Sequence, residues 1–323
     1  MPKDKKKVII FGLGSIGSRH LGLLRQYFDF QIYAYRSKKR PPKALGHIKE
    51  LYAWEEVDEI RPDIAFITNP TFLHIDTALK CARSGMKLFI EKPIGHSSSG
   101  FGSLLKEVRR KKLVTYVAYN LRFHPVIRWL KDYLGSSQIY HASVYNSSDI
   151  RAWRPGKDHR SSYSGKKSEG GGVILDLSHE FDYIGYLFAG IRSIKGRAAR
   201  LSGFTTDAED CLDAIIDTQA ARVNLHINIF SRSRERWIRI DSCKGNIYAD
   251  LINSRIEGVG PRGRFAKSFS GGVPLTYKLQ LDYFFRNINN PAMMNNLFEA
   301  EALFRKLIKF RGQEYENLRN NRR

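Results

Sequence analysis

The N-terminal part of the chain alternates between short apolar runs and segments with helical spacing. The apolar runs are rich in β-branched and aromatic residues, as buried strands are: VIIFG (8–12), FQIYAY (30–35), DIAFIT (63–68), KLFIEKP (87–93) and VTYVAYN (114–120). The helical segments between them are GSRHLGLLRQYF (17–28), TFLHIDTALKCARSG (71–85) and GFGSLLKEVRRKK (100–112). Because strands alternate with helices, this part predicts a doubly wound parallel sheet covered on both faces.

The pattern changes after Asn120. One helical segment (124–135) is followed by a strand, by a long polar stretch (146–172) and by a helix that begins ILDLSHEFDYIGYLF (174–188). Longer strands with alternating polarity come next, at 212–220, 221–230, 235–243 and 245–252. Consecutive alternating strands predict an open, mainly antiparallel sheet in an α+β domain. We therefore expect an α/β protein with a Rossmann domain over 1–121 and a second domain over 122–323, which includes an amphipathic terminal helix at 297–311.

A glycine motif directly follows the first predicted strand. Gly12, Gly14 and Gly17 have the spacing G-x-G-x-x-G and open a helical pattern. In a dinucleotide-binding loop these glycines allow a tight turn, a close approach of the backbone to the phosphates, and close packing of helix on strand. The helix N-terminus at Ser15 and Ile16 would face the pyrophosphate. The alternative is a glycine-rich turn in an α/β domain that binds no cofactor.

The end of the second predicted strand bears on the choice of dinucleotide. NAD-specific sites carry an acidic residue there, whereas this chain continues with Arg36, Ser37 and Lys38. Arg36 could stack on adenine and pair with a 2′-phosphate, with Ser37 and Lys38 as further donors. The sequence thus favours NADP(H), with NAD still possible, and a solvated basic turn is the alternative reading.

Four motifs in register give a family resemblance. With the glycine loop, the stretches ITNPTFLH (67–74), FIEKP (89–93) and GGGVILDLSHEFD (170–182) make the chain resemble the glucose–fructose oxidoreductase / inositol dehydrogenase / MocA family over nearly its whole length. The resemblance implies a substrate bound between the two domains and a homo-oligomer, either dimer or tetramer. It implies cofactor contacts at Thr68, Asn69, Pro70, His74, Glu91 and Lys92, and a catalytic group of Lys92, Asp176 and His179. The family more often separates the Asp and the His by four residues than by three, which leaves the role of Asp176 open.

These residue types suit hydride transfer between nicotinamide and a carbohydrate CH–OH group. His179 could accept the hydroxyl proton, because the pKa of histidine lies near neutrality. Lys92 could hydrogen-bond to the same oxygen and stabilise its developing negative charge. Asp176 could orient either partner. A histidine on a helix is by itself more often structural, so His179 is singled out only by the accompanying motifs.

A narrower likeness concerns the substrate. The stretches YNLRFHP (119–125) and WRPGKDHRSSYSGKK (153–167) look like a branch of the family associated with surface-glycan and sialic-acid-like sugar biosynthesis, which suggests a sugar acid or a nucleotide sugar. The basic segment from Arg151 to Lys167 could be a lid that holds an anion, or simply a hydrated loop. The substrate-binding candidates are Arg122, His124, Trp153, Arg154, Arg160 and Tyr163.

Charge and cysteines narrow the function classes further. Against 32 Asp and Glu the chain has 54 Lys and Arg, a net charge of +22, yet no nucleic-acid-binding motif accompanies the basic residues. Cys81, Cys211 and Cys243 are far apart, which favours free thiols, no metal site and a reducing cytoplasm. We expect no membrane span. Arg232, Arg234 and Arg236 alternate along one strand, so their mutual repulsion could disturb self-association. The main rival to an enzyme is a catalytically silent NAD(P)-binding regulator on the same fold.

Overall fold

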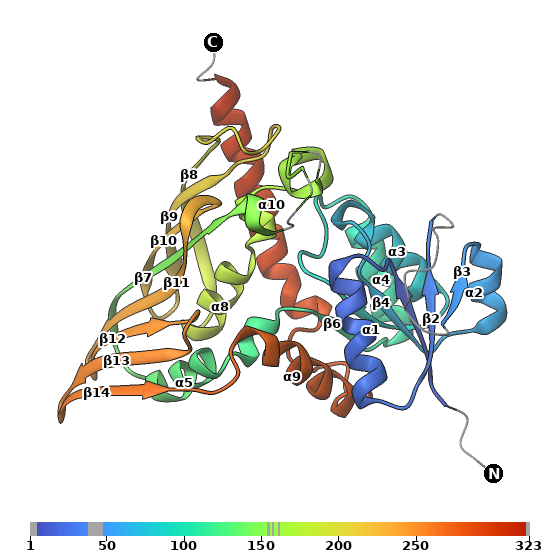
Figure 1. Ribbon diagram of the computed structural model, residues 1–323, viewed down its shortest axis with the longest axis horizontal. Helices are drawn as coiled ribbons and strands as arrows, with labels where there is room; N and C mark the ends of the chain where they lie inside the picture. The colour runs from blue at the N-terminus through green and yellow to red at the C-terminus, as the bar shows by residue number, and fades with distance from the viewer. Residues whose placement is uncertain (1–4, 38–47, 154–155, 157, 161, 321–323) are drawn as a thin grey trace. The chain divides into compact units, whose positions relative to one another are not determined.

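Two sheets organise the chain, one in each of two structural units. In the computed structural model the first unit comprises Met1–Ala118 and Leu281–Glu301, and the second comprises Tyr119–Gln280 and Ala302–Arg323. The structure describes residues 5–37, 48–153, 156, 158–160 and 162–320. Each unit is considered by itself below, with its elements labelled as in Figure 1.

The first unit contains a six-stranded parallel sheet in the order β3-β2-β1-β4-β5-β6 (Figure 1). Its strands are β1 (Lys7–Phe11), β2 (Gln31–Tyr35), β3 (Lys49–Leu51), β4 (Ile64–Ile67), β5 (Lys87–Ile90) and β6 (Thr115–Val117). The helices between them are α1 (Ser15–Tyr27), α2 (Trp54–Ile60), η1 (Thr71–Leu73), α3 (His74–Arg83) and α4 (Phe101–Lys111). The strand order reverses between β1 and β4, where doubly wound sheets bind their ligands. The predicted Rossmann architecture is confirmed, although the sequence pattern missed the short β3 and α2.

Residues 281–301 belong to the first unit, contrary to the predicted boundary at 121/122. The second half of α9 (Val273–Arg286) carries two phenylalanines that complete this unit's aromatic core. The Phe285 ring centre lies 4.5 Å from that of Phe28, and the Phe284 ring centre lies 5.4 Å from that of Phe89. A continuous stretch of sequence was therefore the wrong description of the second domain, because burial of these rings returns the chain to the first.

The second unit contains an eight-stranded sheet in the order β14-β13-β12-β11-β7-β10-β9-β8 (Figure 1). Its strands are β7 (Ile139–Asp149), β8 (Ile191–Ala199), β9 (Cys211–Thr218), β10 (Arg222–Asn228), β11 (Phe230–Ser242), β12 (Gly245–Asp250), β13 (Arg255–Gly260) and β14 (Gly263–Ser268). Neighbouring strands are antiparallel except β7 and β10, which run parallel. The predicted α+β domain with a mainly antiparallel sheet is confirmed.

The second unit also contains helical elements, of which the longest, α10, begins in the first unit. They are η2 (Asn120–Phe123), α5 (Pro125–Leu134), α6 (Ile150–Trp153), η3 (Tyr163–Gly165), η4 (Lys167–Glu169), α7 (Val173–Asp176), α8 (His179–Leu187) and α10 (Leu297–Asn320). One sheet face is apolar and covered, since Leu212 and Ile216 of β9 are fully buried while Ile215 between them is exposed. The first residues of the polar stretch at 146–172 belong to a strand, because β7 continues to Asp149.

The helix predicted from residue 174 onward is two helices. The first, α7, ends at Asp176, and Leu177 then has φ −105° and ψ 30°, outside the helical range. The second, α8, begins at His179. Asp176 and His179 therefore do not share the face of one continuous helix, as we had expected, but lie on either side of a break.

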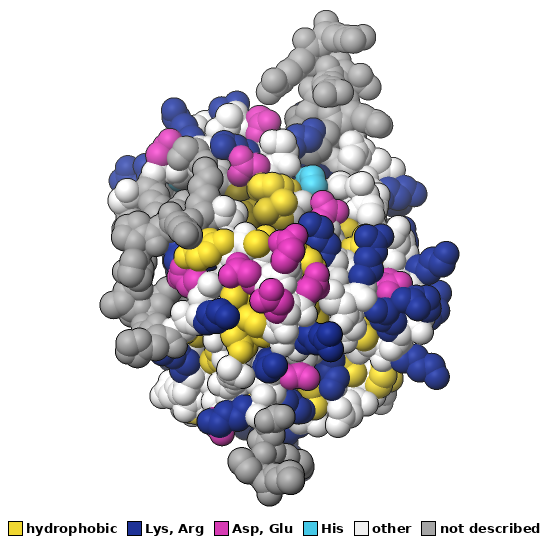
Figure 2. All heavy atoms as spheres, turned by 90° about the vertical axis from the view of Figure 1, so that its right-hand side faces the viewer, with side chains coloured by type: hydrophobic (Ala, Val, Ile, Leu, Met, Phe, Trp, Pro, Cys, Tyr) yellow, Lys and Arg dark blue, Asp and Glu magenta, His cyan; other side chains and the backbone are white. Residues whose placement is uncertain are grey.

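The positive charge does not cover the surface evenly. Figure 2 shows Asp and Glu side chains gathered at the centre of the face on which Figure 1 draws β3 and α2, with Lys and Arg around them. The short helix α2 has the sequence WEEVDEI and accounts for four acidic residues on this side. Among the described residues, no helix combines the length and the apolar character that crossing a membrane requires.

Candidate functional site

The loop after β1 requires glycine at two of its three motif positions. Gly12 has φ +93°, and a Cβ atom there would lie 2.8 Å from the Asn69 Cα. A Cβ atom on Gly17 would lie 2.0 Å from the carbonyl oxygen of Gly12. The Thr68 hydroxyl donates to that same oxygen at 2.6 Å, which ties the loop to the end of β4. These contacts fix the tight turn that the sequence predicted.

The middle glycine of the motif, Gly14, faces open space. A Cβ atom on Gly14 would meet no protein atom within 4 Å, and Gly14 and Ser15 are both exposed. Helix α1 starts here without a side-chain cap at Gly14 and without an acidic residue in its first turn. Its backbone N–H groups and positive dipole end therefore suit an anion such as a pyrophosphate. The chemistry of this loop fits the dinucleotide that the motif implies.

Substitutions of Gly14 and Gly17 are expected to have different effects on stability and on cofactor binding. Gly14→Ala should leave the free energy of unfolding within about 0.5 kcal/mol of wild type, since the methyl group meets no protein atom. It should nevertheless weaken NADPH binding, because the methyl group occupies the space that the phosphates need. Gly17→Ala should cost about 1–3 kcal/mol of stability through overpacking. Urea unfolding and nicotinamide fluorescence titration measure both quantities. Equal NADPH affinity of Gly14→Ala and wild type would remove this loop from the cofactor site.

A carboxylate lies at the end of β2, although the sequence around Arg36 has none. Glu50 of the neighbouring β3 accepts a hydrogen bond from Arg36 Nη1 at 2.5 Å and another from the Tyr52 hydroxyl. Burial opposes ionisation of Glu50, but these two hydrogen bonds lower its pKa overall. Ser37 is exposed beside the pair, and Lys38 lies outside the described residues. Arg36 is thus held in place by Glu50, a residue that the sequence pattern did not identify.

The loop after β5 carries Glu91, Lys92 and Pro93, and the Lys92–Pro93 peptide bond is cis. Lys92 is partly exposed, whereas Glu91 is 7% exposed and its Oε1 lies 2.7 Å from His20 Nε2. Of the other residues expected to contact the cofactor, Thr68 is buried, Asn69 is half-buried and Pro70 is exposed.

His74 is placed in the interior of the first unit and not on its surface. The residue is 2% exposed, and both ring nitrogens lie 2.8 Å from backbone carbonyl oxygens, those of Pro93 and Asn69. The expectation that His74 contacts the cofactor directly is therefore corrected, because its polar atoms are occupied by the loops on either side of it.

The two candidate catalytic residues of the second unit lie beside the break between α7 and α8. Asp176 is buried and His179 is half-buried, with the His179 ring centre 5.9 Å from that of Tyr119 at a steep angle. Burial raises the pKa of Tyr119 and keeps the phenol neutral. The perpendicular contact with Tyr119 restricts the orientation of the His179 imidazole.

A buried ion pair anchors the start of α7. Gly172 has φ +106°, and a Cβ atom there would lie 2.4 Å from the Glu209 carboxylate. Glu209 Oε1 accepts a hydrogen bond from the Ile174 amide at 3.3 Å, and it lies 3.6 Å from Arg311 Nε. Arg311 of α10 also donates to the Gly171 carbonyl at 2.5 Å. Gly172 is thus needed because the Glu209 carboxylate packs against its backbone.

Arg122 and His124 were expected to face the substrate, and the structure places both in the interior of the second unit. Arg122 donates to both oxygens of Asp182, at 2.7 and 3.0 Å, and is 9% exposed. His124 is fully buried and accepts the Val126 amide as the N-cap of α5. Burial and the Arg236 charge lower the pKa of His124 to about 4, so the ring is neutral. Both side chains thus lie inside this unit, and contact of either with a substrate stays a prediction.

The described residues of the basic segment make several close contacts. Arg151 donates to Asp149 at 2.6 Å and lies over the Phe204 ring, and the Trp153 indole donates to the Ser148 hydroxyl. A Cβ atom on Gly171 would lie 2.3 Å from the Tyr163 carbonyl oxygen, so this part of the chain folds closely on itself. Arg160 is exposed and Tyr163 is half-buried, while Arg154 lies outside the described residues.

Two clusters in the second unit were not anticipated. Arg236 pairs with the fully buried Glu180 at 2.9 Å, so it points to the core side of β11. It does not line up with the exposed Arg232 and Arg234 as expected.

The atoms of Cys211, Asp213 and His226 that could bind a metal ion lie within 4.8 Å of one another. Burial, with the nearby carboxylates of Asp213 and Asp210, raises the pKa of the Cys211 thiol to about 11. His226 Nδ1 lies 2.6 Å from Asp213, so these two side chains bind each other.

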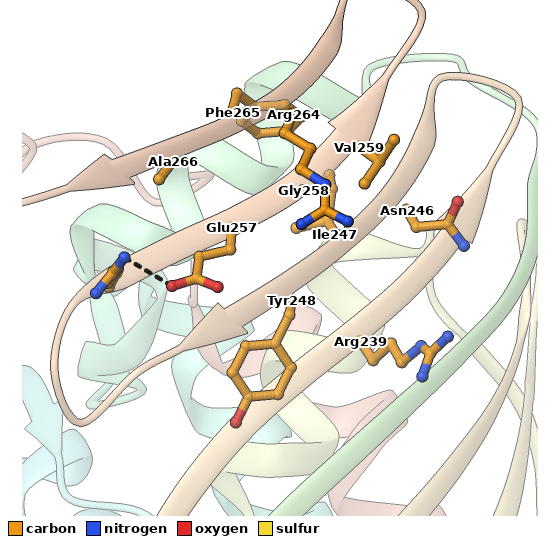
Figure 3. Close-up of a pocket in the computed structure, with 11 residues that line it drawn as sticks. Arg239, Asn246, Ile247, Tyr248, Glu257, Gly258, Val259, Arg264, Phe265 and Ala266 are labelled. Atoms are coloured by element: carbon orange, nitrogen blue, oxygen red, sulfur yellow. Dashed lines mark ion pairs between the residues drawn. The ribbon is translucent and has the colours of Figure 1, made fainter.

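A hollow of about 580 Å³ lies on the exposed face of β11–β14, away from all the predicted catalytic residues of this unit. Figure 3 shows Arg239, Asn246 and Tyr248 among its lining residues, and an ion pair of Glu257 that joins it to Arg255 at 2.8 Å. Its charges are already paired in part and no histidine lines it. We therefore identify the candidate site by the motif residues and not by this hollow.

Comparisons with known proteins match both parts of the chain to one family. Residues 6–119 match the model of the GFO/IDH/MocA oxidoreductase family with an NAD-binding Rossmann fold, and residues 138–248 match the model of the GFO/IDH/MocA C-terminal domain. Myo-inositol 2-dehydrogenase of Thermotoga maritima is 23% identical over 306 residues, which are 88% of this chain and 88% of that protein.

Solved structures share the fold. A levoglucosan dehydrogenase in complex with NADH superposes with a TM-score of 0.81 at 15% identity, over 96% of this chain and 97% of that one. UDP-N-acetylglucosamine 3-dehydrogenase of Acidithiobacillus ferrooxidans gives a TM-score of 0.78 at 15% identity, over 94% and 95% of the two chains. The likeness in fold thus extends over both structural units.

Proposed function

Because the chain belongs to the GFO/IDH/MocA oxidoreductase family, we propose that it is a dehydrogenase or reductase that transfers a hydride between NADP(H) and a CH–OH group of a sugar. The observation that carries the proposal is the loop at Gly12–Gly17, whose open position at Gly14 and uncapped helix suit a pyrophosphate. When bound, the nicotinamide accepts or gives the hydride. The presence of Lys92, Asp176 and His179 in the expected motifs favours an enzyme over a silent regulator.

We assign distinct roles to the three polar residues. The Lys92 ammonium donates a hydrogen bond to the reacting oxygen and stabilises the negative charge that develops on it. His179 accepts the hydroxyl proton in the oxidative direction and returns it in the reductive one. Asp176, one turn away across the helix break, orients the imidazole or binds a neighbouring hydroxyl. The relatives that act on inositol, levoglucosan and UDP-N-acetylglucosamine support a carbohydrate as the substrate class.

Arg36 is the basis for proposing NADP(H). Its guanidinium is fixed by Glu50 at 2.5 Å, and its remaining N–H donors can pair with a 2′-phosphate. NADPH should therefore bind several-fold tighter than NADH, and Arg36→Ala should narrow that difference by about 1–3 kcal/mol, the contribution of a charged hydrogen bond. Nicotinamide fluorescence titration measures both affinities. Equal affinities for the two cofactors in the wild type would contradict the assignment.

The substrate can be sought without knowing it in advance. We propose a sugar acid or nucleotide sugar, because Arg160, three residues before Tyr163 in the basic segment, offers an exposed positive charge. A thermal-shift screen of neutral sugars, sugar acids and nucleotide sugars with NADP⁺ should identify compounds that stabilise the protein only beside the cofactor. Compounds so identified should produce absorbance at 340 nm. Stabilisation without any change at 340 nm would favour the silent regulator.

A further inference from the structure

Two buried histidines hold the residues on either side of Lys92. His20 of α1 is fully buried, and its Nε2 lies 2.7 Å from the carboxylate of Glu91, the residue before Lys92. His74 of α3 is 2% exposed, and its Nδ1 lies 2.8 Å from the carbonyl oxygen of Pro93, the residue after Lys92. The lysine is thus flanked along the chain by two hydrogen-bonded neighbours.

The His20 ring is held in one orientation by aromatic side chains. It meets Phe89 edge to face with ring centres 5.1 Å apart, and the Phe66 ring centre is 5.7 Å away. These phenylalanines belong to β5 and β4 and are fully buried. Because α1 begins at the glycine loop, His20 connects the Glu91 carboxylate to the helix whose N-terminus suits a pyrophosphate.

His74 joins the loop of Lys92 to the loop after β4. Its second ring nitrogen, Nε2, lies 2.8 Å from the carbonyl oxygen of Asn69. Carbonyl oxygens only accept, so a neutral imidazole can donate to one of these two oxygens, whereas an imidazolium donates to both. Burial lowers the pKa of His74, while the two carbonyl oxygens and the charge of Glu91 act in the opposite direction.

We propose that His20 and His74 are positioning residues that act as a pair to fix the backbone of Lys92, and through it the place of the lysine amine. The inference rests on the proposed function, in which that amine touches the reacting oxygen. Four methylene groups separate the lysine amine from its Cα atom. The region that the amine can reach is therefore set by the position of that Cα atom. A displacement of about 1 Å at a reacting group can cost a hundredfold in rate.

The test compares variants that remove each hydrogen bond with variants that keep a donor. His20→Leu and His74→Leu remove it, and His20→Gln and His74→Gln retain an N–H group of similar reach. His141→Gln on the second unit, where the side chain is 40% exposed, is the matched control. Hydrogen exchange is followed by mass spectrometry over residues 90–95 and over α4, and acetylation of Lys92 and Lys106 by acetic anhydride is followed across pH.

In the Leu variants, exchange over 90–95 should be at least about tenfold faster and exchange over α4 unchanged, because a local opening has become easier. The pH profile of Lys92 acetylation should shift while that of Lys106 does not. The Gln variants should restore most of the wild-type exchange over 90–95 and most of the wild-type acetylation profile of Lys92. If a Leu variant does not fold, its Gln counterpart and Glu91→Gln carry the comparison, and smaller shifts in the same direction are expected.

Unchanged exchange over 90–95 and unchanged Lys92 acetylation in the folded variants would overturn the inference. Equal acceleration over 90–95 and α4 would also overturn it, because it would mean general loosening of the unit. These readouts need no turnover. Normal turnover of a Lys92→Ala variant would refute the proposed function alone, whereas unchanged exchange would refute the positioning role whatever Lys92→Ala does.

Discussion

Lys92→Ala and His179→Ala variants are expected to fold, to bind NADPH still, and to turn over about a hundredfold more slowly or worse, the usual scale for losing a general acid–base residue. Binding should survive because the pyrophosphate is proposed to bind at the Gly12–Gly17 loop, which neither substitution alters. Asp176→Asn should cost less than either if Asp176 only orients its partners. If the altered spacing has made Asp176 the proton acceptor, its loss should cost about as much. Steady-state rates and fluorescence titration separate these cases.

The double variant sharpens this prediction. Lys92 and His179 are proposed to act on one oxygen, so their combined loss should be far smaller than the product of the two single losses. His141→Gln is the control for an exposed histidine elsewhere on the second unit. Near-normal single-turnover hydride transfer by His179→Ala from pH 6 to 9 would place the base elsewhere, and Lys92 would then be the first candidate.

Asp182→Ala is expected to lower the free energy of unfolding of the second unit by about 3–5 kcal/mol, as breaking a buried ion pair does. The change leaves the Arg122 guanidinium buried without its carboxylate. Arg122 and Lys131 both lie over the Tyr186 ring, at 5.1 and 5.0 Å, so two positive charges would remain together. Their closeness already contributes, after burial, to lowering the pKa of Lys131.

An exposed pair provides the matched control for this experiment. Glu107 accepts a hydrogen bond from Arg110 at 2.6 Å on α4, but the Arg110 side chain is 61% exposed. Glu107→Ala should therefore change stability by no more than about 0.5 kcal/mol. Urea unfolding of both variants gives the comparison. A loss of less than 1 kcal/mol in Asp182→Ala would show that Arg122 finds another partner or water, and that the pair is not essential to the fold.

The periodicity of apolar residues predicted both sheets, because each buried strand contributes its own local pattern. The β4 and β5 runs are apolar throughout, as buried parallel strands are, and β9 alternates. Very short elements were not predicted. Strand β3, for example, has three residues, too few to show a periodic pattern. The return of residues 281–301 to the first unit escaped as well, because it depends on Phe284 and Phe285 finding aromatic partners far away in sequence.

The candidate site was predicted less evenly than the fold. The glycine loop was accessible from sequence because its demands are local: Gly12 needs a positive φ and Gly17 needs close packing. The carboxylate of Glu50 was not, because it reaches Arg36 from another strand. Basic residues were misjudged in the same way. Arg122 looked free to hold an anion, and only the fold reveals its carboxylate partner, Asp182, 60 residues later in the chain.

The central claim is that a hydride passes between a sugar carbon and the nicotinamide. The most direct test uses a sugar found in the thermal-shift screen, with deuterium on the carbon that bears the reacting hydroxyl, mixed with the enzyme and NADP⁺. We expect mass spectrometry to show NADPH heavier by one deuterium from the wild type, and far less of it from Lys92→Ala over the same time. Reduced cofactor without deuterium, or no reduced cofactor although sugar and NADP⁺ are both bound, would contradict the account.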